Sequence, residues 1–184
     1  MKIRRLLITA LILLALTETL VAQRCSDISR VDFRNFKIKP KQTAENLFDF
    51  DLQFRNGIFD YSPLPQFGPD WRFKIVRDTV VRPAGGEKVR FIGIFANHFG
   101  GTGSQEYLIG FRCWNGKLQN VFQQNGEGMR VVSLGPREIH LRFGVWKQSD
   151  AHCCPSADKD VWFFWSGKSH SYAKKKILLR TRRQ

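Results

Sequence analysis

Residues 107–122, which read YLIGFRCWNGKLQNVF, decide the fold of this chain. Residues 107–114 and 118–122 are short runs rich in β-branched and aromatic side chains, a composition typical of β-strands. Between them lies Asn115-Gly116, the dipeptide that most readily takes the positive φ angles of a type I′ turn. The stretch therefore predicts an antiparallel β-hairpin.

Strand-like runs recur on both sides of this hairpin. Residues 47–54 alternate polar and apolar side chains, and the segments 71–76, 89–95, 139–146 and 161–165 are again rich in β-branched and aromatic residues. Two similar turns are expected at Asn56-Gly57 and Ser166-Gly167. After residue 22, no segment sustains a 3.6-residue apolar repeat over ten residues. The sequence predicts an all-β fold, a single small sandwich or barrel-like antiparallel sheet domain after an N-terminal signal helix.

That signal helix falls within residues 1–22, which read as a cleavable secretory signal peptide. Lys2, Arg4 and Arg5 precede an apolar run over residues 6–16, and a small residue, Ala22, ends the segment. A helix of this run extends about 16 Å, roughly half of a ~30 Å hydrocarbon core. We therefore expect a periplasmic or extracellular protein with no transmembrane span after processing. An uncleaved anchor or a buried core helix is the alternative.

The charge of the chain is strongly basic. Its formal net charge is +14, of which the first 22 residues hold three basic residues and one acidic one, so about +12 remains after cleavage. Such a balance favours acidic partners, although it also serves solubility. Outside the cytoplasm the nearest polyanions are those of the cell envelope, so we expect no specific nucleic-acid partner.

The basic residues gather at the C-terminus. Seven of them and no acidic residue lie between Lys168 and Gln184. Because blocks of like charge repel and stay solvated, we expect a β domain over residues 23–172 and a basic tail over residues 173–184. This tail is a possible contact for an envelope polyanion. Residues 177–179, Ile-Leu-Leu, leave the alternative of a last edge strand.

Four cysteines remain after processing: Cys25, Cys113, Cys153 and Cys154. An even number in an exported chain indicates disulfides, and four cysteines allow three pairings. Adjacent residues on a strand face opposite ways, which favours structural links from Cys153 and Cys154 to Cys25 and Cys113. A direct Cys153–Cys154 link would be strained and easily reduced, which would instead indicate redox chemistry.

Candidate binding residues lie in two loops, one rich in glycine and one holding the adjacent cysteines. They are His98, Gly100, Gly101, Thr102 and His152. The chain has no Gly-x-Ser-x-Gly, His-Glu-x-x-His or Cys-x-x-Cys motif, so we assign no catalytic residue, metal ligand or cofactor.

Several short motifs occur in a fixed order along the chain. They are DFRNF at 32–36, RNG at 55–57, FGGTG at 99–103, WNG at 114–116 and CCPS at 153–156, followed by an aromatic strand. With these motifs in this order, the chain resembles an uncharacterised family of exported bacterial β-rich proteins with DFRNF, GGTG and CCPS motifs. Its members carry an acidic loop before GGTG. Residues 82–89 hold one carboxylate here, so calcium binding is not expected.

The resemblance implies export and a β-rich fold, and it carries no activity. Our leading hypothesis is an exported, non-enzymatic binding or interaction module whose ligand or protein partner is unknown. The alternative is a redox or hydrolytic cell-envelope enzyme that uses the Cys153-Cys154 loop.

Overall fold

The computed structural model describes residues 25–41, 50–63, 66, 68–100, 104–148, 150 and 155–181. The expected signal peptide, residues 1–22, lies outside these ranges. Among the described residues, no helix is long and apolar enough to cross a membrane.

The described residues form three antiparallel sheets, and short 3-10 turns precede them at η1 (Ile28–Arg30) and η2 (Phe33–Asn35). The largest sheet has the order β3 (Ile58–Tyr61), β4 (Trp71–Val81), β5 (Val89–His98), β6 (Ser104–Trp114), β7 (Lys117–Gly126). The second has the order β11 (Ser171–Thr181), β10 (Ala157–Ser166), β9 (Glu138–Val145), β8 (Arg130–Leu134). The third pairs β1 (Lys37–Ile38) with β2 (Leu52–Gln53). The predicted all-β fold is confirmed.

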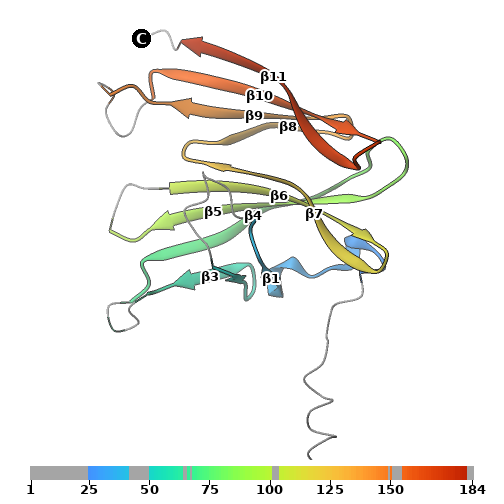
Figure 1. The fold of residues 1–184 in the computed structure, drawn as a ribbon. Helices are drawn as coiled ribbons and strands as arrows, with labels where there is room; N and C mark the ends of the chain where they lie inside the picture. The colour runs from blue at the N-terminus through green and yellow to red at the C-terminus, as the bar shows by residue number, and fades with distance from the viewer. Residues whose placement is uncertain are drawn as a thin grey trace, which may run out of the picture.

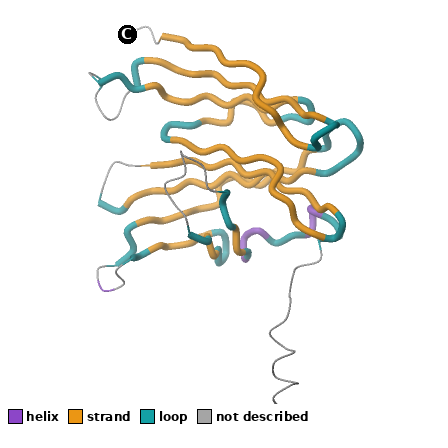
Figure 2. The backbone as a smooth tube through the Cα atoms, in the orientation of Figure 1, coloured by secondary structure: helices purple, strands orange, loops and turns teal. Residues whose placement is uncertain are grey.

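The five-stranded sheet carries a hydrophobic core on each face. Along β5, Phe91 belongs to the cluster that includes Leu141 and Phe163 of the four-stranded sheet. Its neighbour Ile92 belongs to the cluster that includes Phe33 of the N-terminal segment. Because successive side chains of a strand point to opposite faces, β5 is buried on both sides. Figures 1 and 2 show the resulting stack, with the five-stranded sheet between the other two layers.

The DFRNF and RNG motifs form one structural unit. The amide of Gly57 donates a 2.7 Å hydrogen bond to the carbonyl of Arg34, and the amide of Asn56 donates one of 2.9 Å to Asn35 Oδ1. Asn56 and Gly57 both have positive φ angles, 52° and 82°. These motif residues therefore have a folding role, since they fix the N-terminal segment against the turn before β3.

The central hairpin is confirmed. Asn115 and Gly116 have φ angles of 49° and 74°, as a type I′ turn requires, and they connect β6 to β7. The last predicted turn is longer than a two-residue loop, because β10 pairs with β11 up to Ser166 and Ser171. In that turn His170 takes a positive φ of 49°.

Two strands differ from the expectation. Arg130–Leu134 forms β8, which the sequence did not single out, because its side chains are mostly exposed and its run is short. Residues 173–181, expected to belong to a tail, continue β11 and pair with β10 as far as Thr181. The alternative of a last edge strand is the observed one, and the β domain extends beyond residue 172.

The favoured prediction, disulfides from Cys153 and Cys154 to Cys25 and Cys113, is wrong. Cys25 and Cys113 are linked to each other, with their Cα atoms 5.2 Å apart. The amide of Cys25 also donates a 2.9 Å hydrogen bond to the carbonyl of Gly116, which places the start of the described chain against the β6–β7 hairpin. Cys153 and Cys154 lie outside the described residues.

Candidate functional site

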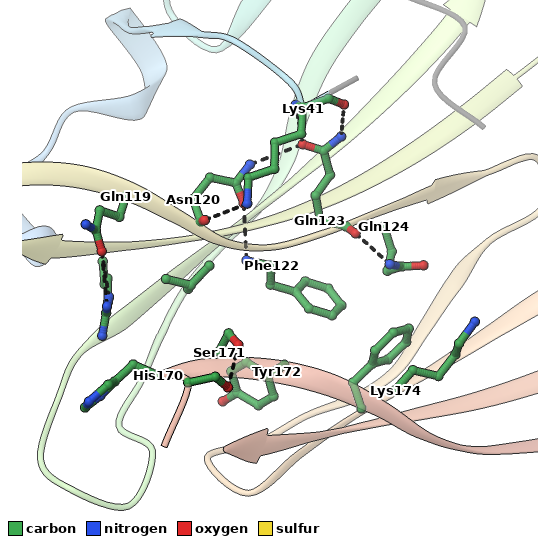
Figure 3. A pocket seen from close by; sticks show the side chains of 14 residues that line it. Lys41, Gln119, Asn120, Phe122, Gln123, Gln124, His170, Ser171, Tyr172 and Lys174 are labelled. Carbon is green, nitrogen blue, oxygen red and sulfur yellow. Dashed lines mark hydrogen bonds between the residues drawn. The ribbon is translucent and has the colours of Figure 1, made fainter. Parts of the chain in front are cut away.

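A polar groove of about 540 Å³ lies between β7 and β11, the edges of the two large sheets. Its walls come from residues 119–124 of β7 and from residues 169–172, which include the end of the β10–β11 turn and the start of β11. Lys41, Arg112, Phe163 and Lys174 complete the lining. Figure 3 shows Phe122 and Tyr172 between the two strands, and Asn120 and Gln123 turned toward Lys41. We call it the β7–β11 groove.

The β7 wall is a row of amide side chains. Gln119, Asn120, Gln123 and Gln124 all line the groove, although they do not follow the strict alternation of a regular strand. The reason is a bulge opposite the middle of β6, where the pairing register shifts at Val121. A bulge at a sheet edge redirects the side chains around it, and here it brings polar groups from both strand faces to the groove.

Gln123 holds the segment that ends at Lys41 against this wall. Its carboxamide accepts a 2.8 Å hydrogen bond from the Lys41 amide and donates one of 2.8 Å to the Lys41 carbonyl. Lys41 Nζ in turn donates a 2.9 Å hydrogen bond to the carbonyl of Asn120. This reciprocal pairing resembles a sheet ladder and places a lysine at the rim of the groove.

The floor of the groove is apolar and closed. The rings of Phe122 and Phe163 meet edge to face, 5.0 Å between centroids, and Tyr172 packs against Phe122 at 6.0 Å. All three side chains belong to the core between the two sheets. The Tyr172 hydroxyl donates a 3.1 Å hydrogen bond to the carbonyl of Gly135, and burial raises the pKa of this phenol. A ligand therefore meets polar walls above a rigid aromatic base.

One end of the groove is closed by a charged and aromatic cluster. Glu87 lies 2.8 Å from Arg112 Nη1 through one oxygen and 2.7 Å from His170 Nδ1 through the other. The Arg112 guanidinium also lies over the Trp114 ring at 4.7 Å and donates hydrogen bonds to Gln119 Oε1. Glu87 thus offsets the charge at this end and ties the β10–β11 turn to the five-stranded sheet.

The opposite end carries uncompensated positive charge. Lys174 is exposed, and no acidic side chain of the described residues pairs with it. Gln124 and Lys174 also line a second hollow of about 310 Å³, which adds Lys159 and Glu127. Gln124 donates a 2.6 Å hydrogen bond to the carbonyl of Gln123, and its own carboxamide oxygen has no partner in the described part of the chain. These two residues mark the junction of the two hollows.

This lining fits a ligand rich in hydrogen-bonding groups. A carboxamide donates and accepts at once, so it matches hydroxyl groups, and the described residues that line the groove include cations and no carboxylate. Elsewhere among the described residues, no three His, Cys, Asp or Glu side chains come together as metal ligands would.

The predicted binding residues do not line this groove where they are described. His98 ends β5 and meets the Trp71 ring at 5.0 Å, and Gly100 follows in a turn with a φ of 78°. Gly101, Thr102 and His152 lie outside the described residues, so the glycine-rich and cysteine loops stay a prediction.

The sequence did hold a signal for the β7 wall. Residues 119–125 read QNVFQQN, five carboxamides in seven residues, with no charged side chain among them. A strand that faced only solvent would more commonly carry charged residues. A run of carboxamides without charge therefore indicates a polar surface that makes specific hydrogen bonds. The β11 wall could not be found in the same way, because it required knowing that two edges far apart in sequence lie side by side.

Comparison with known proteins adds no relative. No protein-family model, curated protein sequence or solved structure matches this chain. The resemblance based on the DFRNF, GGTG and CCPS motifs therefore remains a prediction.

Proposed function

We propose that this protein is an exported, non-enzymatic binding module that takes an acidic oligosaccharide into the β7–β11 groove. The observation that carries the proposal is the lining itself, in which amide side chains and cations surround an apolar floor. Export is supported by the sequence of residues 1–22 and by the Cys25–Cys113 disulfide.

The chemistry of the lining favours a saccharide over a smaller apolar ligand. Sugar hydroxyls both donate and accept hydrogen bonds, as the carboxamide of Gln124 does, whereas the aromatic floor is mostly buried and offers little open apolar surface. Lys174 adds a charge that a carboxylate or sulfate group would match. An envelope polysaccharide with such groups agrees with the net charge of the chain.

Binding is tested by calorimetric titration of the purified protein with uronate-containing oligosaccharides and with neutral oligosaccharides of similar length. Lys174→Gln should weaken binding of the acidic series roughly tenfold and leave the neutral series almost unchanged. Gln124→Ala should weaken both series. Lys168→Gln and Gln148→Ala are the matched controls, because both residues are exposed and lie outside the groove. The proposal fails if neither series binds, or if the controls weaken binding as much as the groove variants.

The alternative, a redox or hydrolytic enzyme at the Cys153-Cys154 loop, rests on residues outside the described ranges. With Cys25 and Cys113 linked to each other, each of these adjacent cysteines has only the other left as a partner within the chain. Mass spectrometry of the oxidised protein tests it: two free thiols at 153 and 154 would contradict a redox disulfide there.

A further inference from the structure

The far half of β11 stands clear of the core. Every residue from Ala173 to Thr181 is exposed, although the segment is a strand that pairs with β10 on both sides of a bulge at Lys175. Three consecutive apolar side chains lie in it: Ile177 is 53% exposed, Leu178 40% and Leu179 64%. Because successive side chains of a strand point to opposite faces, Ile177 and Leu179 lie on one face of β11 and Leu178 on the other, so this edge of the four-stranded sheet presents apolar side chains on both faces. We call residues 177–179 the β11 strip.

The strip is held in place by its neighbours and needs no partner to be ordered. Arg180 Nε lies 3.0 Å from the buried carboxylate of Asp160 on β10. Lys176 Nζ lies over the Trp162 ring at 4.8 Å, and Lys175, at a bulge in the β10–β11 pairing, lies over Phe164 at 5.8 Å. The two lysines directly precede the strip, and these ring contacts position their side chains without neutralising their charge.

The surroundings of the strip are cationic. Residues 161–184 include no aspartate or glutamate, and the lysine run 174–176 directly precedes the strip. On β10, Asp160 is already engaged by His140, Arg142 and Arg180, and Asp158 lies opposite Arg180 in the strand pairing. A partner for this surface must accordingly offer apolar contact and negative charge together.

A second copy of the chain does not meet that requirement. If two β11 strands paired antiparallel with Leu178 opposite Leu178, Lys176 of each would face Arg180 of the other. Like charges directly opposite one another destabilise a strand pair. Lysines on an edge strand commonly prevent such edge-to-edge association.

We propose that the β11 strip docks on the surface of an anionic phospholipid bilayer. With this edge of the sheet lying on the bilayer, Ile177 and Leu179 on one face and Leu178 on the other would enter the boundary between headgroups and acyl chains, and Lys175 and Lys176 would contact the anionic headgroups. A soluble polyanion would satisfy the lysines and leave the three apolar side chains in water. Ile177 also lines the second hollow, but none of residues 177–179 lines the β7–β11 groove, so the inference does not depend on the proposed function.

The test is co-sedimentation of the protein, as cells process it, with phosphatidylglycerol-containing vesicles and with vesicles of phosphatidylcholine alone. We expect binding to the first only. Replacing all three strip residues by threonine keeps the β propensity of the strand and should weaken binding to these vesicles about tenfold or more. Lys175→Gln with Lys176→Gln should weaken it roughly thirtyfold, given about 1 kcal/mol per lysine near such a surface.

Matched controls separate this surface from general effects of the substitutions. Val76→Thr with Val132→Thr replaces two comparably exposed apolar side chains elsewhere, and Lys117→Gln with Lys168→Gln removes two exposed lysines outside β11; both variants should bind like wild type. Equal binding to both vesicle types, or unchanged binding of the threonine variant, would overturn the proposal. Retention on a sulfated polysaccharide without vesicle binding would identify a soluble polyanion instead. A concentration-dependent dimer that the threonine variant abolishes would identify a second copy.

Discussion

Arg142 Nε donates a 2.9 Å hydrogen bond to the carboxylate of Asp160, whose side chain is fully buried. Asp160 lies on β10, the strand between β9, which supplies Arg142, and β11, which supplies Arg180. His140 Nε2 completes the arrangement at 2.7 Å from the same carboxylate. A charge removed from water in this way is tolerated only when such partners surround it. The residue therefore couples three strands of the four-stranded sheet through one side chain.

Replacing Asp160 by asparagine should destabilise the protein strongly. The substitution keeps the shape but leaves two arginines near a neutral group, and removing one partner of a buried ion pair typically costs about 3 kcal/mol or more. Urea unfolding followed by tryptophan fluorescence measures the change. Glu138→Gln, on β9, is the matched control and should shift the free energy of unfolding by less than about 0.5 kcal/mol. A similar loss in both variants would show that the ion pairs of Asp160 are not the cause.

The same carboxylate makes stability depend on pH in a defined direction. Burial acts to raise the pKa of Asp160, but the hydrogen bonds and positive charges of Arg142 and His140 outweigh it and hold the pKa below the ordinary 3.8. The carboxylate therefore contributes fully to the stability of the fold above pH 3.8, and this contribution is lost as the pH falls through the lower pKa of the folded state. The stability difference between wild type and Asp160→Asn should shrink between pH 4 and pH 2 in urea titrations. A difference that stays constant over this range would contradict the assignment.

The fold was predictable from the sequence where local patterns and tertiary structure agree. Residues 107–122 combine two apolar runs with an Asn-Gly turn, and the structure has this hairpin with the expected positive φ angles. Tertiary pairing overrode local composition in β11, where a lysine run suggested a solvated tail. The long pairing with β10 keeps residues 173–181 in a strand even though none of them is buried.

The groove was less predictable because it has no single sequence segment of its own. Its walls come from strands about fifty residues apart, and the polar side chains of β7 reach it through a bulge that pairing with β6 creates. The disulfide was missed for a related reason. Sequence distance gives no preference among three pairings, and the contact between Cys25 and the β6–β7 hairpin exists only in the folded chain.

Gly110 lies where β6 passes closest to the aromatic core. A Cβ added there would lie 2.8 Å from a ring carbon of Phe91 and 3.1 Å from Phe122 Cβ, and both side chains are buried. Gly110→Ala should therefore lower the free energy of unfolding by roughly 2 kcal/mol through overpacking. Gly167→Ala is the control, because nothing lies within 4 Å of its Cβ and its φ is not positive. Thermal unfolding that shifts equally for both variants would contradict the close approach.

The Cys25–Cys113 disulfide should be a major source of stability. It closes a loop across a sequence separation of 88 residues, which corresponds to about 4.6 kcal/mol in the chain-entropy model, and Cys25 itself is buried in the N-terminal core. In urea unfolding, we expect the free energy of unfolding of the double variant Cys25→Ser with Cys113→Ser to be lower by roughly 2–4 kcal/mol. Proteolysis without reductant should release the peptides of Cys25 and Cys113 as one linked species. Wild type treated with reductant should approach the stability of the double variant, since the same constraint on the unfolded chain is removed. Peptides linking Cys25 to Cys153 or Cys154 would contradict the pairing and restore the arrangement that strand geometry alone had favoured.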